Sequence, residues 1–215
     1  ISKQMWRQDI GAAWSGFVVS TNRAITQEQR GENEIVSCYD LLTGKMLWMH
    51  SNPGRYDTKI AGEGPRATPT IHEKNVYALG ATGILNCLEL ETGKPVWQRN
   101  IASDAGLEND DEVDQTGASK KRNKAKEWGY SSSPLILEGK VIVSAGGESG
   151  KSLLAYNLDS GEPVWSGGNS RAGYSSAHTA TIHGEEQVLI FNQEELTAHT
   201  PETGSVIWSF EWKVG

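Results

Sequence analysis

Residues 39–50, YDLLTGKMLWMH, place a glycine in a polar turn and a tryptophan four residues after it. The same arrangement returns in LELETGKPVWQR (88–99), YNLDSGEPVWSG (156–167) and HTPETGSVIWSF (199–210). The repeated residues are Gly44, Gly93, Gly161 and Gly204, followed by Trp48, Trp97, Trp165 and Trp208. A turn and an aromatic residue at one fixed offset indicate a repeat architecture.

A second landmark precedes each repeated glycine. The landmarks are SGFVVS, ATPTIH, SSPLIL and SSAHTA, which begin at Ser15, Ala67, Ser132 and Ser175. Counted from the second residue of each landmark, the repeated glycine follows after 28, 25, 28 and 28 residues. The units therefore have nearly constant length, as copies of one supersecondary element require.

Each unit contains four short apolar runs separated by turns. In the second unit the runs are TPTI, VYALG, ILNCLELE and KPVWQRN. Such runs predict strands joined by hairpins, and no stretch keeps the 3.6-residue apolar period of a helix. We therefore predict an all-β protein, a β-propeller of four-stranded antiparallel blades with about four blades present.

The predicted boundaries follow the repeat within one propeller region, 1–215. The expected blades are 11–53, 54–102, 128–168 and 169–215, with an outer strand of a preceding blade at 1–10 and a charged insert loop at 103–127. Trp6 is expected to hold the outer-strand tryptophan position in that preceding blade. In every unit the glycine would supply the positive φ of a tight hairpin turn, and the tryptophan would fill the gap between neighbouring blades.

Residues 155–165, AYNLDSGEPVW, resemble the tryptophan-docking motif of the quinoprotein-type β-propellers, the PQQ-like repeat family. This family includes PQQ-dependent alcohol dehydrogenases and a non-enzymatic lipoprotein of outer-membrane β-barrel assembly. The resemblance implies a ring of seven or eight blades, of which this chain would form part, and a periplasmic or secreted location. No signal peptide is visible, since no basic and apolar leader begins the chain at Ile1; either a leader was removed or the chain is a piece of a longer one.

Composition excludes several classes of partner. The net charge of −7 argues against nucleic acid, which needs a surplus of lysine and arginine. The longest apolar runs are about five residues, too short for a transmembrane helix.

Cys38 and Cys87 occupy the same repeat position in adjacent sheets. Such sheets pack about 10 Å apart, which is too far for a disulfide. They are expected to be small buried residues with free thiols.

Candidate catalytic motifs find little support. AGGESGKS (145–152) matches a relaxed phosphate-loop pattern, but the repeat makes it a hairpin loop, whereas a phosphate loop must open a helix. The five histidines lack zinc-binding spacing, and no G-x-S-x-G elbow occurs. The serine runs YSSSP and YSSA recur at the start of inner strands, which favours a packing role. We therefore assign no catalytic, cofactor-binding or metal-ligating residue.

Function is expected in the irregular connections instead. The insert is acidic first and basic after, and a solvated loop, a partner-binding loop or a calcium-assisted loop are all open to it. Connections between blades and the loops between second and third strands should emerge at one end of the propeller. There the candidate binding rim is aromatic and cationic. It consists of Trp14, Arg66, Trp128, Tyr130, Arg171 and Tyr174.

Three functions are compatible with this pattern. The first hypothesis is a non-catalytic PQQ-like repeat protein that binds a protein partner or a small ligand at the loop end, in the cell envelope or outside the cell. The alternative is part of a dehydrogenase that oxidises alcohols or sugars with PQQ and calcium. A carbohydrate-binding module that uses the aromatic rim is the third. Cofactors are expected only under the alternative.

Overall fold

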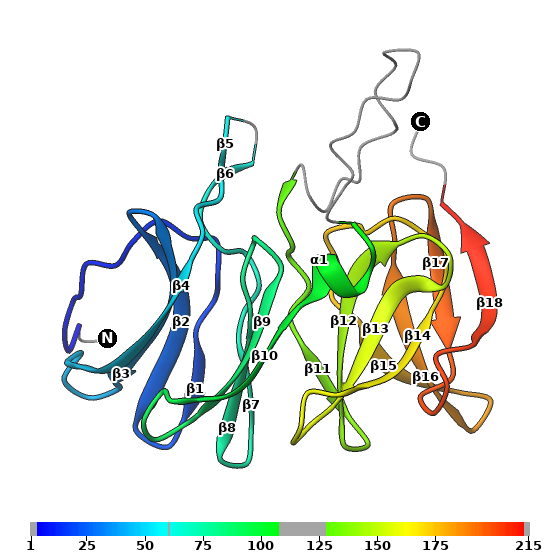
Figure 1. Cartoon of the computed structure of the whole chain (residues 1–215). Helices are drawn as coiled ribbons and strands as arrows, with labels where there is room; N and C mark the ends of the chain where they lie inside the picture. The colour runs from blue at the N-terminus through cyan, green and yellow to red at the C-terminus, as the bar shows by residue number, and fades with distance from the viewer. Residues whose placement is uncertain (1–3, 60, 108–127, 213–215) are drawn as a thin grey trace.

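The computed structural model describes residues 4–59, 61–107 and 128–212. Within these ranges the strands form four four-stranded antiparallel sheets and one two-stranded hairpin. Figure 1 shows the four sheets side by side in chain order, from the blue N-terminal sheet to the orange and red C-terminal one. The predicted four-stranded antiparallel propeller blades are confirmed.

We number the sheets as blades 1 to 4, each with its strands in chain order from one edge to the other. Blade 1 contains β1 (Val18–Ser20), β2 (Arg23–Arg30), β3 (Asn33–Asp40) and β4 (Met46–Pro53). Blade 2 contains β7 (Thr70–His72), β8 (Asn75–Leu79), β9 (Ile84–Glu89) and β10 (Pro95–Asn100). Blade 3 contains β11 (Leu135–Leu137), β12 (Lys140–Gly147), β13 (Lys151–Asn157) and β14 (Pro163–Gly167). Blade 4 contains β15 (His178–Ile182), β16 (Glu185–Phe191), β17 (Glu195–His199) and β18 (Val206–Glu211).

Two short elements lie between blades. The hairpin of β5 (Asp57–Thr58) and β6 (Gly62–Glu63) follows blade 1, and the helix α1 (Ile101–Asp104) follows blade 2. The Asn100 side chain caps α1 by accepting hydrogen bonds from the backbone of Ala102 and Ser103. No helix in the described ranges is long and apolar enough to cross a membrane. From residue 108 onward, the predicted charged insert lies outside the described residues.

Every blade carries the same irregularity just before its repeated tryptophan. In blade 1, Cys38 pairs with Trp48 but Tyr39 pairs with Met46, so Leu47 is an extra residue in the outer strand. The same register shift occurs in the other three blades. The extra residues are Leu47, Val96, Val164 and Ile207, which are 41–47% exposed. Such a bulge bends the outer strand and redirects the side chain that follows it.

The apolar core lies between neighbouring blades. One cluster joins blades 1 and 2, a larger one joins blades 2 and 3, and a third joins blades 3 and 4. Cys38 and Cys87 are buried and free, as predicted, and each lies opposite the tryptophan of its own blade. Burial raises the pKa of each thiol to about 11.

The N-terminal segment differs from the prediction of an outer strand at 1–10. Residues 4–10 form no strand, because the described chain offers no third strand of a preceding blade with which they could pair. The two residues that follow are bonded to blade 1: the Gly11 N–H donates to Glu28 Oε2, and Ala12 forms a bridge with Gln29. Trp6 nevertheless contacts the turn of blade 1.

Candidate functional site

The repeated tryptophans lie on the repeated glycines of the following unit. Trp48 lies on Gly93, Trp97 on Gly161, Trp165 on Gly204, and Trp6 takes the equivalent place on Gly44. A Cβ added to any of these glycines would lie within 2.6 Å of an indole carbon. Their φ angles of 69–73° also favour glycine, as the tight-turn prediction requires.

A hydrogen bond accompanies each of these contacts. The indole N–H donates to the backbone oxygen three residues before the glycine: Leu41 (2.8 Å), Leu90 (3.0 Å), Leu158 (3.0 Å) and Pro201 (2.9 Å). Trp208 has no following blade among the described residues and donates to Gln187 Oε1 of its own blade at 2.9 Å. These contacts join blades and leave the indole N–H groups occupied.

A row of hydroxyl groups joins the blades at their inner strands. The Gly16 N–H donates to Thr68 Oγ1 at 3.0 Å, and the Thr68 N–H donates to Ser133 Oγ at 3.0 Å. The Ser133 N–H in turn donates to Ser176 Oγ at 2.9 Å. These four residues are the second residues of the sequence landmarks, so the repeated serines act between blades, as the expected packing role implies. In the sequence, this row is indicated by a hydroxyl residue at three of the four equivalent landmark positions.

The irregular segments gather at one end of the propeller, which we call the loop face. A backbone hydrogen bond joins each connection to the turn between the second and third strands of a blade. The Gly54 N–H donates to Glu32 O (2.9 Å), and the Tyr130 N–H donates to Ala81 O (3.0 Å). In blade 4 the turn residue is the donor, since the Gln193 N–H donates to Arg171 O of the connection (3.0 Å). The hairpin β5–β6 and helix α1 also lie at this end (Figure 1). These bonds support the predicted common face for the connections.

Trp14 and Arg66 of the predicted rim lie beside the hairpin β5–β6. Trp14 is 68% exposed, and its indole covers Gly62. The Arg66 guanidinium donates to Ala61 O (2.7 Å), Gly62 O (3.0 Å) and Gly64 O, so it holds the hairpin. It also stacks over Tyr56, with Cζ 4.4 Å from the ring centroid.

Trp128 lies in the connection that leads into blade 3, and Arg171 and Tyr174 lie in the connection that leads into blade 4. The rings of Trp128 and Tyr174 meet edge to face, with centroids 5.8 Å apart. Arg171 pairs with Glu194 at 2.6 Å. Tyr130 differs from the prediction of a surface position: it is only 3% exposed, and its ring packs against Gly83 in the core.

The two parts of the rim are linked by Tyr56, which the sequence did not single out. Arg66 stacks on one side of this ring, and a Cβ on Gly129 would lie 3.1 Å from its Cζ atom. Gly129 directly follows Trp128. Contacts therefore run from Arg66 through Tyr56 to the segment that carries Trp128, which in turn meets Tyr174.

Two carboxylates of blade 1, Glu28 and Glu34, are buried and hydrogen-bonded. Glu34 of blade 1 accepts hydrogen bonds from the N–H groups of Ala81 (2.6 Å) and Thr82 (3.3 Å) in the β8–β9 turn. Burial raises the pKa of Glu34, while its hydrogen bonds oppose that shift. Glu28 is paired with Arg30 at 3.0 Å and also bonded to Tyr39 at 2.9 Å. Each carboxylate thus has partners that explain its burial.

The segment AGGESGKS (145–152), which matches a relaxed phosphate-loop pattern, is part of the hairpin β12–β13, as predicted. Residues 148–150 form its turn, and the Gly150 N–H donates to Asn169 Oδ1 at 2.7 Å. No helix follows this turn; β13 does. Within the described residues, no group of three or more His, Cys, Asp or Glu side chains is placed to hold a metal ion.

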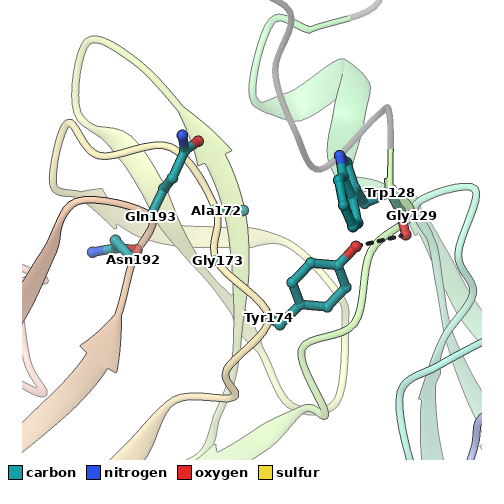
Figure 2. A pocket seen from close by; sticks show the side chains of 7 residues that line it. All are labelled: Trp128, Gly129, Ala172, Gly173, Tyr174, Asn192 and Gln193. Carbon is teal, nitrogen blue, oxygen red and sulfur yellow. Dashed lines mark hydrogen bonds between the residues drawn. The ribbon is translucent and has the colours of Figure 1, made fainter. Parts of the chain in front are cut away.

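A groove opens on the loop face beside Trp128 and Tyr174 (Figure 2). Its volume is about 250 Å³. The lining comes from three segments, the end of the β10–β11 connection, the β14–β15 connection and the β16–β17 turn. It consists of Trp128, Gly129, Ala172, Gly173, Tyr174, Asn192 and Gln193.

The repeated blades and the contacts between them define a β-propeller of PQQ-like repeats. A family model described as outer membrane protein assembly factor BamB matches residues 2–124 and 112–212, and the chain belongs to this family. It is 29% identical over 149 residues to the outer membrane protein assembly factor BamB of Moranella endobia, which covers 62% of this chain and 38% of that protein.

Solved structures share the fold. BamB from Moraxella catarrhalis aligns with a TM-score of 0.60 at 16% identity, over 91% of this chain and 50% of that one. Quinohemoprotein alcohol dehydrogenase from Comamonas testosteroni aligns with a TM-score of 0.62 at 17% identity, over 94% of this chain and 35% of that one. The chain thus spans half or less of the length of these relatives.

Proposed function

We propose that the chain is a non-catalytic binding scaffold that contributes to outer membrane protein assembly in the cell envelope. Membership of the BamB family carries this proposal, because relatives of that family are named for outer membrane protein assembly. The loop face is the proposed partner surface. Its connections vary between units while the blades repeat, and exposed aromatic residues of the kind enriched in interfaces lie on it.

Site-specific photo-cross-linking tests the scaffold and its face together. A cross-linking amino acid would replace Trp14 or Tyr174 on the loop face, and Leu42 as the control. Leu42 is 62% exposed and lies in the β3–β4 turn at the opposite end. Cross-links from the loop face to a protein of the outer membrane assembly machinery, with none from Leu42, are expected. Equal cross-linking from both ends, or none from the loop face, would overturn the proposal.

Titration with PQQ and calcium separates this function from the dehydrogenase alternative. No cofactor is proposed for the scaffold, so the absorbance of added PQQ should stay that of the free compound and a dye-linked alcohol oxidation assay should show no turnover. Stoichiometric uptake with turnover would replace the scaffold by the dehydrogenase.

A further inference from the structure

The groove on the loop face has an aromatic wall, formed by Trp128 and Tyr174, that is held in place. Tyr174 is 52% exposed, yet its ring meets Trp128 edge to face at 5.8 Å and 77°. Its hydroxyl lies 3.5 Å from the backbone oxygen of Trp128, as the dashed line in Figure 2 shows. An aromatic wall fixed before binding reduces the entropy that a partner must overcome.

The floor of the groove is backbone that cannot carry larger side chains. A Cβ on Gly173 would lie 2.8 Å from the Phe191 backbone oxygen. Gly129 has a φ of 76° and lies against Ala81 and Tyr56. Glycine is therefore required at both positions, where a side chain would clash or be strained.

One polar group of the groove lacks a partner. Gln193 Oε1 is shielded from solvent, and no described residue donates a hydrogen bond to it. Its neighbour Asn192 is satisfied, since Nδ2 donates to Thr197 Oγ1 at 3.0 Å and Oδ1 accepts from Ser152 at 3.4 Å. A shielded acceptor without a donor is costly, so a partner that supplies a donor to Gln193 would relieve this cost.

Among the described residues beside the groove, the more exposed charge belongs to a carboxylate. Glu194 follows Gln193 and pairs with Arg171, but the Glu194 side chain is 68% exposed whereas that of Arg171 is 18% exposed. An approaching partner therefore meets the carboxylate first. A basic residue next to the bound group would complement it.

The size and lining of the groove identify the class of occupant. Pockets for whole small molecules usually have volumes of about 300–1,000 Å³, and this groove of about 250 Å³ suits one large side chain. A sugar would require several polar groups around it, whereas most of the lining is aromatic, alanine or glycine. A buried aromatic side chain in such a pocket is the usual anchor of a protein interface.

We propose that this groove is an anchor site for a tryptophan or tyrosine side chain of a partner polypeptide, with its N–H or O–H directed to Gln193 and a basic residue beside Glu194. The proposal rests on the proposed scaffold function and specifies the chemistry of its partner. The apolar ring would lie against Trp128 and Tyr174.

Short peptides test the anchor directly. The probes are acetyl-Ala-Trp-Lys-Ala-amide, the same peptide with 1-methyltryptophan or phenylalanine in place of tryptophan, and chitotetraose. Binding would be followed by calorimetry and by NMR shifts of the groove residues. The tryptophan peptide should bind best, and loss of its donor should weaken binding by about 2–13-fold, the range expected for one hydrogen bond. Preferential binding of chitotetraose, or equal binding of the tryptophan and methylated peptides, would overturn the proposal.

Matched variants assign the binding to the groove. Tyr174→Ala should weaken the tryptophan peptide at least tenfold, and Gln193→Leu should abolish the preference over 1-methyltryptophan. Trp212→Ala is the control, because Trp212 is 55% exposed and forms a similar edge-to-face pair with Phe191 outside the groove lining. Equal effects of Tyr174→Ala and Trp212→Ala would contradict the anchor.

The anchor and the scaffold can fail separately. If loop-face cross-linking to the assembly machinery persists unchanged in Tyr174→Ala, the anchor is wrong and the scaffold stands. If the peptide binds as expected but no assembly protein cross-links to the loop face, the scaffold is wrong. Thermal unfolding of each variant confirms that the fold is retained before either result is interpreted.

Discussion

Trp97 of blade 2 lies on Gly161 of blade 3, and its indole N–H donates to the Leu158 backbone oxygen at 3.0 Å. The contact joins the outer strand of one blade to a turn of the next. Equivalent contacts unite all the blades, so the repeated motif stabilises the arrangement of blades rather than a chemical site. The stability of the propeller should therefore depend on these pairs.

Gly161→Ala should destabilise the protein more than Gly139→Ala. Both glycines have nearly the same φ, 72° and 71°, so each alanine incurs the left-handed strain of about 1–2 kcal/mol. A Cβ at position 139 meets nothing within 4 Å, whereas one at 161 would overlap the Trp97 ring. This overlap should add about 1–3 kcal/mol. Urea denaturation measures both, and equal losses would contradict the assigned contact.

Trp97→Ala should lower the free energy of unfolding by about 3–5 kcal/mol, the usual cost of removing a buried tryptophan. Trp208→Ala should cost clearly less. Trp208 has the same place in its blade, but its indole N–H is bonded to Gln187 within that blade. Thermal midpoints of the two variants give the comparison. An unchanged midpoint for Trp97→Ala would show that the tryptophan does not hold the blades together.

The fold was predictable because its main determinants are local. A glycine with positive φ and a tryptophan at a fixed distance can be recognised in one sequence, and their repetition predicts four similar sheets. The bulge before each tryptophan was not predictable. Val96 or Val164 looks like any strand residue, and only the register with the neighbouring strand shows that it is extra.

The candidate site was predictable only in part, because it depends on contacts between distant segments. Sequence spacing placed Trp14 and Tyr174 at one end of the propeller. It could not show that Tyr130 turns into the core towards Gly83, or that Tyr56 links the two parts of the rim. The Arg66 donors are bonded to the hairpin backbone, a result of tertiary folding that composition does not encode.

Ser176→Ala should destabilise the boundary between blades 3 and 4 by about 1 kcal/mol, because the Ser133 N–H loses its acceptor. Ser176→Thr should retain the bond, as Thr68 does at the equivalent position in blade 2. Hydrogen exchange of the Ser133 amide gives the local readout, and it should speed up in the alanine variant alone. Equal exchange in both variants would show that the hydroxyl row does not act between blades.

His199 should make the protein lose stability in mild acid. Its ring is fully buried, with Nδ1 2.8 Å from the Gly204 backbone oxygen and Nε2 2.9 Å from Thr197 Oγ1. Burial lowers its pKa below the ordinary value of 6.5, so the unfolded chain binds a proton more readily than the folded one. This contribution to stability is complete above about pH 6.5 and is lost as the pH falls towards the lower folded pKa, by at most about 1.4 kcal/mol per pH unit.

Urea denaturation between pH 7.5 and 5 tests this linkage by comparing the wild type with His199→Gln. The wild type should lose stability relative to the variant as the pH falls below about 6.5. Titration of the carboxylates affects both proteins equally, so it cancels in the difference between their free energies of unfolding. His178→Gln, at an exposed position of β15, controls for removal of an imidazole. If the wild type and His199→Gln lose stability in parallel, burial does not hold the imidazole in its neutral form.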